Sequence, residues 1–181
     1  MPYFNIVSQS AESTVVTEYK PQSKRSEAYQ SEADLEKEFI RLLCELGYER
    51  LTIHKEADLI ANLRTQLEKL NNYRFTDGEW KRFWDEVLAN TNSGILEKTR
   101  LIQEDYVQVL RRDNGESKNI QLIDKKCIHN NSLQVINQYA ISTEEGAAHD
   151  NRYDVTVLVN GLPLIHIELK RRGVPIREAF N

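Results

Sequence analysis

Residues 153–170 read Tyr-Asp-Val-Thr-Val-Leu-Val-Asn-Gly-Leu-Pro-Leu-Ile-His-Ile-Glu-Leu-Lys, and this stretch decides the fold of the 181-residue chain. Two apolar, β-branched runs flank Asn160-Gly161, two residues that tolerate the positive φ angles of a tight hairpin turn. The stretch is therefore predicted to be a β-hairpin. Its charged residues gather at the end away from the turn, where they are Asp154, Glu168 and Lys170.

The register of this hairpin decides whether its two carboxylates can meet. A regular two-residue turn pairs Val159 with Leu162. In that register Asp154 and Glu168 lie on opposite faces of the sheet. A three-residue loop or a one-residue bulge pairs the two carboxylates instead. We predict such an irregularity, with Pro163 as its location, because proline has no N–H to give to the ladder.

The charged end of the hairpin has the composition of a metal site. Glu168 and Lys170 are two residues apart on a strand and project to the same face. With Asp154 opposite, they form the oxygen-rich arrangement that binds Mg²⁺, a cation that activates water and stabilises charge in phosphodiester hydrolysis. The alternative is solvated charge at a strand end. Glu-x-Lys also occurs at 79–81 and 116–118, in a chain with 29% charged residues.

The same residues carry a resemblance to a known family. Asp154, followed after an apolar hairpin by Glu168-Leu169-Lys170, resembles the PD-(D/E)xK nuclease signature. The surrounding residues are similar to the amino-terminal domain of the restriction (motor) subunit of type I restriction-modification enzymes. This implies Mg²⁺-dependent cleavage of double-stranded DNA. Asp154, Glu168 and the Leu169 carbonyl would be metal ligands and Lys170 the catalytic lysine. Tyr153 stands where the signature has proline.

The resemblance also implies roles for residues outside the signature. The first helix of many such nucleases gives a further glutamate to the metal, and this role falls on Glu36, at the edge of the buried face of its helix. A solvated helix-edge glutamate is the alternative.

Two observations outside the resemblance predict DNA contacts. Arg171, Arg172 and Arg177 form a basic run with Lys170 beside the proposed site, with an ordinary solvated face as the alternative. His166 shares a strand face with Glu168, where it would contact DNA or a metal-bound water, with a packed strand histidine as the alternative.

We predict an α/β fold of the restriction-endonuclease-like type, a mixed β-sheet flanked by helices and centred on the hairpin. Ser31 caps a helix over 31–46 that packs on this sheet and ends at Gly47. The other predicted elements are a strand at 14–17, a strand within 49–56, helices over 59–70 and 76–88, a hairpin over 106–124, a strand at 133–141 and a helix from 173.

Residues 1–30 are predicted to be an amino-terminal extension and 31–181 the nuclease domain. We expect a fragment of a longer chain, cut within the helix after the hairpin. The net charge of −4 argues against DNA binding by bulk electrostatics alone. Because the sequence contains neither an apolar run long enough to span a membrane nor a secretion signal, we expect a cytoplasmic protein with no membrane contact. Cys44 and Cys127 lack metal-binding spacing, and we expect reduced, partly buried thiols.

The family resemblance implies partners as well as an activity. They are double-stranded DNA, the methyltransferase and specificity subunits of a restriction complex, and helicase-like domains of the same full-length chain. Mg²⁺ is the expected cofactor. ATP is expected for the full-length subunit alone, since no phosphate-binding Gly-x-x-x-x-Gly-Lys motif occurs here. The alternatives are a non-catalytic docking module of a DNA-processing complex and a repair nuclease that acts without ATPase partners.

Overall fold

The computed structural model describes residues 3–9, 14–20, 31–53, 55–141 and 151–170. The chain divides into two compact units, residues 1–30 and residues 31–181. The first unit contains an antiparallel hairpin of β1 (Tyr3–Gln9) and β2 (Thr14–Lys20). The sequence predicted a strand at 14–17, which the structure extends to Lys20, and it missed β1.

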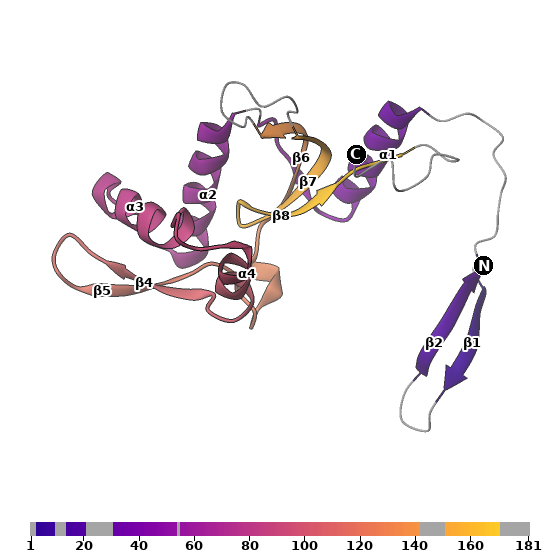
Figure 1. Ribbon diagram of the computed structural model, residues 1–181, viewed down its shortest axis with the longest axis horizontal. Helices are drawn as coiled ribbons and strands as arrows, with labels where there is room; N and C mark the ends of the chain where they lie inside the picture. The colour runs from indigo at the N-terminus through magenta and orange to yellow at the C-terminus, as the bar shows by residue number, and fades with distance from the viewer. Residues whose placement is uncertain (1–2, 10–13, 21–30, 54, 142–150, 171–181) are drawn as a thin grey trace. The chain divides into compact units, whose positions relative to one another are not determined.

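The second unit is built on a mixed sheet whose described strands have the order β3-β6-β7-β8 (Figure 1). The strands are β3 (Glu49–Arg50), β6 (Leu133–Ile141), β7 (Asn151–Val159) and β8 (Leu162–Ile167). β3 runs parallel to β6, and the other neighbouring pairs are antiparallel. The α/β class, the strand at 133–141 and the hairpin are confirmed, whereas the strand within 49–56 is only two residues long.

Helices cover both faces of this sheet (Figure 1). On one face α1 (Glu32–Glu45) buries Ile40 against Val135 and Val155. On the other face Leu59, in α2 (Glu56–Asn71), packs against Ile136 and Leu158. Alternate residues of β6 and β7 thus serve opposite faces, as the period of a strand requires. The predicted cap of α1 is confirmed, because the Ser31 side chain accepts the Asp34 N–H.

A third hydrophobic cluster lies around α3 (Asp77–Phe83), which continues as a π-turn, η1 (Trp84–Leu88). The predicted helix over 76–88 begins with a capping box of Thr76 and Glu79. Its aromatic side chains belong to the cluster: Phe83 is 2% exposed, and Trp80 and Trp84 pack against it. The sequence also predicted the hairpin of β4 (Val107–Arg111) and β5 (Ser117–Gln121), which forms its own two-stranded sheet. It predicted neither α4 (Ile95–Gln103) nor the 3₁₀ turn η2 (Ile128–Asn130).

The expectation of partly buried cysteines is wrong. Cys44 and Cys127 are free, but both are exposed. Cys44 lies near the end of α1, next to Leu43, which packs on the sheet, and before the C-cap Leu46, which is 74% exposed. Cys127 lies in the loop before η2. In the described part of the chain no helix is long and apolar enough to cross a membrane. The predicted helix from 173 lies outside the described residues, as do residues 142–150.

Candidate active site

The hairpin of β7 and β8 has the irregular register that its charged end requires. The turn pairs Val159 with Leu162, and Leu158 pairs with Pro163. The next pair joins Val157 to Ile165, so one extra residue, beside Pro163, is accommodated in β8. This bulge confirms the predicted irregularity and its place. It shifts the register by one residue for the rest of the hairpin.

The turn of the hairpin is built into the core. Asn160 and Gly161 have φ angles of 51° and 82°, the left-handed values that the pair was predicted to adopt. Asn160 is 1% exposed. Its amide Nδ2 donates to the Leu122 carbonyl at 3.0 Å, and its Oδ1 accepts the Ser132 N–H at 2.8 Å. A Cβ on Gly161 would lie 2.6 Å from the Cα of Leu63, so α2 leaves no room for a side chain.

At the other end, Asp154 holds the chain that follows β8. The last pair of the ladder is Val155 with Ile167, so the next residues outward are Asp154 and Glu168. The Leu169 N–H donates to Asp154 Oδ2 at 2.7 Å. The carboxylate thus takes the place of a backbone acceptor where the ladder ends. This hydrogen bond fixes the residue between Glu168 and Lys170.

Glu168 and Lys170 form an ion pair at the surface. Lys170 Nζ lies 2.6 Å from Glu168 Oε1, and the side chains are 27% and 30% exposed, respectively. The hydrogen bond to Glu168 raises the pKa of Lys170, and the nearby carboxylates of Glu32 and Asp154 raise it further. The lysine is therefore an ammonium at neutral pH, able to donate hydrogen bonds but not to accept a proton.

Glu36 lies against β6. Its Oε1 accepts from the side-chain amide of Asn137 at 2.7 Å, and its Oε2 accepts from the amide of Gln138. Gln138 has a left-handed backbone, with φ of 58°, a conformation that costs a non-glycine residue about 1–2 kcal/mol. The ladder pairs Asn137 with Val155 and Tyr139 with Tyr153, and no pair joins the intervening Gln138 and Asp154.

Sequence reasoning missed Asn137 and Gln138. Their one sequence signal is that two consecutive amides interrupt the apolar strand over 133–141. Nothing in that signal indicates the partner, because Glu36 precedes them by about a hundred residues. The left-handed conformation is equally hidden, since glutamine does not favour it.

The oxygen donors at the end of the hairpin away from its turn, called the open end below, suit Mg²⁺. Proteins hold this ion through one or two carboxylates and leave other positions to water or phosphate. Asp154, in β7, and Glu168, directly after β8, each stand one position beyond the last ladder pair and supply such a pair. Within the described ranges, no three His, Cys, Asp or Glu side chains form a group able to hold a metal. The structure therefore does not gather Glu36 with the other two carboxylates, and the ligand roles stay predictions.

The predicted DNA contacts are partly described. His166 is exposed, its ring stacks on Tyr153 with centroids 4.1 Å apart, and its Nδ1 lies 3.0 Å from the Thr156 hydroxyl. Desolvation of the ring lowers the pKa of His166, so it is neutral at pH 7 and would meet DNA without a charge. The three predicted arginines, Arg171, Arg172 and Arg177, lie outside the described residues.

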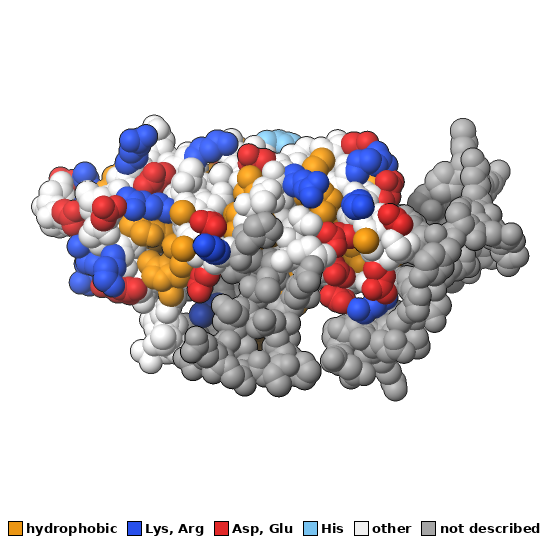
Figure 2. Space-filling model, turned by 90° about the horizontal axis from the view of Figure 1, so that it is seen from above, with side chains coloured by type: hydrophobic (Ala, Val, Ile, Leu, Met, Phe, Trp, Pro, Cys, Tyr) orange, Lys and Arg blue, Asp and Glu red, His pale blue; other side chains and the backbone are white. Residues whose placement is uncertain are grey.

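The surface drawn in Figure 2 mixes basic, acidic and hydrophobic side chains, and its coloured part shows no continuous basic tract. This fits the net charge of −4.

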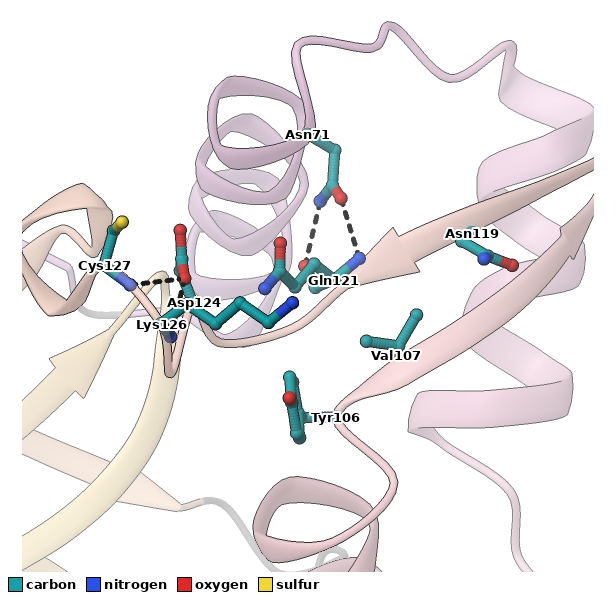
Figure 3. A pocket seen from close by; sticks show the side chains of 8 residues that line it. All are labelled: Asn71, Tyr106, Val107, Asn119, Gln121, Asp124, Lys126 and Cys127. Carbon is teal, nitrogen blue, oxygen red and sulfur yellow. Dashed lines mark hydrogen bonds between the residues drawn. The ribbon is translucent and has the colours of Figure 1, made fainter.

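A hollow lined by none of the predicted site residues lies beside β4 and β5 (Figure 3). Its polar groups serve the fold: Asn71 binds the backbone of Gln121, and Asp124 accepts the N–H groups of Lys126 and Cys127.

Comparisons with known proteins agree on one family. The family model described as type I restriction enzyme R protein N terminus matches residues 29–181. The type I restriction enzyme EcoprrI endonuclease subunit of Escherichia coli is 47% identical over 176 residues, 97% of this chain and 55% of that subunit. The SauMSSORF170P endonuclease subunit of Staphylococcus aureus MSSA476 is 41% identical over 159 residues, 85% of this chain and 16% of that subunit. The chain thus spans about half, or less, of these relatives.

Proposed function

The chain belongs to the family of type I restriction enzyme R protein N termini, and we propose that residues 31–181 are the endonuclease domain of such a subunit, which hydrolyses phosphodiester bonds of double-stranded DNA with Mg²⁺. The observation that carries the proposal is the bulged register of β7 and β8. It makes Asp154 and Glu168 neighbours across the hairpin, with Lys170 bound to Glu168.

Each charged residue of the hairpin has a distinct role in this proposal. Asp154 and Glu168 hold the metal, with the Leu169 carbonyl as a further oxygen donor. Mg²⁺, when bound, supplies positive charge that stabilises the charge developing on the scissile phosphate. Lys170, whose raised pKa keeps it protonated, orients the attacking water and donates to a phosphate oxygen. The proton of the water must therefore leave to an acceptor other than this ammonium.

In the complete subunit, cleavage would follow ATP-driven translocation of DNA. The helicase-like domains for that step would lie outside this chain, which spans 55% and 16% of the two relatives. The methyltransferase and specificity subunits would bring the target sequence, because the mixed surface charge does not favour tight DNA binding by this domain alone. The site of action would be the cytoplasm.

The test is cleavage of supercoiled plasmid by the complete subunit assembled with its partner subunits. Lys170→Ala should reduce cleavage about 100-fold or more, because it removes a donor aimed at developing charge. ATP hydrolysis should remain unchanged. The matched control is Lys98→Ala, an exposed lysine on α4, which should cleave normally. Normal cleavage by the Lys170 variant would favour a docking module.

A further inference from the structure

The Glu36 carboxylate is held by two consecutive residues of one strand. Its two oxygens accept from the side-chain amides of Asn137 and Gln138. Successive side chains of a regular strand point to opposite faces of the sheet, so two neighbours do not ordinarily reach one group. Here they do because Gln138 has a left-handed backbone, with φ of 58°. The unusual conformation and the two hydrogen bonds are thus parts of one arrangement, the Glu36 clamp.

One residue of the clamp, Gln138, lies across the sheet from a predicted metal ligand. In the ladder between β6 and β7, Asn137 pairs with Val155 and Tyr139 with Tyr153. Gln138 is therefore the cross-strand neighbour of Asp154, although the two form no ladder pair. Asp154 uses its carboxylate to hold the Leu169 N–H at 2.7 Å. Strained backbone and interrupted ladders are concentrated at functional sites, where they re-aim side chains.

Resting on the proposed function, we propose that Glu36 is a positioning residue for the metal site and not a ligand. Its carboxylate holds the left-handed Gln138, and this keeps the ladder interrupted at Asp154, so that Asp154 stays on the Leu169 N–H. Without Glu36, Gln138 relaxes to the extended conformation and pairs with Asp154. The Asp154 carboxylate then leaves Leu169, and the two metal-binding carboxylates lose their alignment.

Two substitutions separate positioning from ligation. Glu36→Gln keeps the shape and both hydrogen bonds, because the Gln138 amide can turn over and accept from the new amide. Glu36→Ala removes the clamp. A positioning residue tolerates the first change and not the second. A ligand tolerates neither, since a neutral amide is a much weaker donor to Mg²⁺ than a carboxylate. Glu38→Ala is the matched control, since Glu38 is exposed on the same helix and binds Arg41.

The decisive readout is hydrogen exchange of the Leu169 amide, measured by NMR without metal. In Glu36→Ala and Gln138→Ala we expect exchange at least about tenfold faster than in the wild type, a change of about 1.4 kcal/mol in the opening equilibrium. Asp154→Ala gives the exchange rate of the Leu169 amide when its hydrogen-bond acceptor is absent. Glu36→Gln and Glu38→Ala should stay within about twofold. Wild-type exchange in Glu36→Ala, or equally fast exchange in Glu36→Gln, would overturn the proposal.

Binding of Mn²⁺ by the same proteins relates the clamp to the metal site. Affinity should fall about tenfold in Glu36→Ala and stay near the wild-type value in Glu36→Gln. An equal loss in both variants would make Glu36 a ligand and overturn the proposal. If the wild type binds no Mn²⁺, the proposed nuclease site fails, and the exchange of the Leu169 amide still decides whether the clamp holds Asp154.

Discussion

The two ends of the hairpin formed by β7 and β8 differ in burial and in what holds them: the turn is packed in the core, and the open end is charged and at the surface. At the turn, Asn160 is buried and hydrogen bonded to neighbouring loops, and Gly161 lies against the backbone of Leu63. At the open end, the ladder stops at Val155, and the next residues carry charge at the surface. The same two strands thus have one end fixed by packing and another held by a few polar contacts.

This difference separates what folds the hairpin from what it does. The close contact of the turn with Leu63 fixes the position of both strands relative to α2. The bulge beside Pro163 sets which residues of the two strands lie opposite each other. The turn and the bulge together thus determine which residues lie opposite each other at the open end. Its charged residues add little to stability and are free to serve chemistry, so substitutions at the two ends should have different consequences.

The largest effect on stability is expected at the turn. Gly161→Ala places a Cβ 2.6 Å from the Cα of Leu63 and strains a φ of 82°. Overpacking and the left-handed conformation together should lower the free energy of unfolding by about 3 kcal/mol or more. The measurement is urea denaturation followed by circular dichroism.

Gly115→Ala is the matched control for this prediction. Gly115 has a similar φ of 83°, but a Cβ there would meet nothing within 4 Å. Its cost should therefore be the conformational part alone, about 1–2 kcal/mol. Equal losses in the two variants would show that the close approach to α2 does not fix the turn.

A smaller effect is expected at the open end. The hydrogen bond and charge of Glu168 raise the pKa of Lys170 above its ordinary value. The stabilisation by this ion pair is therefore present below the ordinary pKa of lysine and is lost as pH rises through the raised value. Glu168→Gln should lower the Lys170 pKa and cost at most about 1 kcal/mol at pH 7, because the pair is partly solvated. NMR titration of the Lys170 Cε resonance, with urea denaturation at pH 7, checks both. An unchanged pKa would show that Glu168 does not hold the ammonium.

Local signals in the sequence predicted much of this arrangement. The Ser31 cap, the Asn160-Gly161 turn and the irregularity beside Pro163 each depend on neighbours in the chain, and each is present. α4 was missed because Gly94 gives it no side-chain cap, and Ile95 and Leu96 are exposed, which obscures its apolar stripe.

The features that the sequence did not predict are contacts between residues far apart in the chain. The Glu36 clamp joins α1 to β6, and the left-handed Gln138 follows from that contact and not from the preference of glutamine. The sequence assigned Glu36 to the metal by family resemblance. The structure shows instead which amides hold its carboxylate.

The central claim is that Asp154 and Glu168 form a metal site at the open end of the hairpin. Calorimetric titration of the chain with Mn²⁺ tests it most directly, with Glu168→Ala compared with Glu116→Ala, an exposed glutamate of another Glu-x-Lys sequence. We expect the wild type and Glu116→Ala to bind equally, and the folded Glu168→Ala to bind at least about tenfold more weakly. No binding by the folded wild type, or equal binding by all three proteins, would contradict the claim.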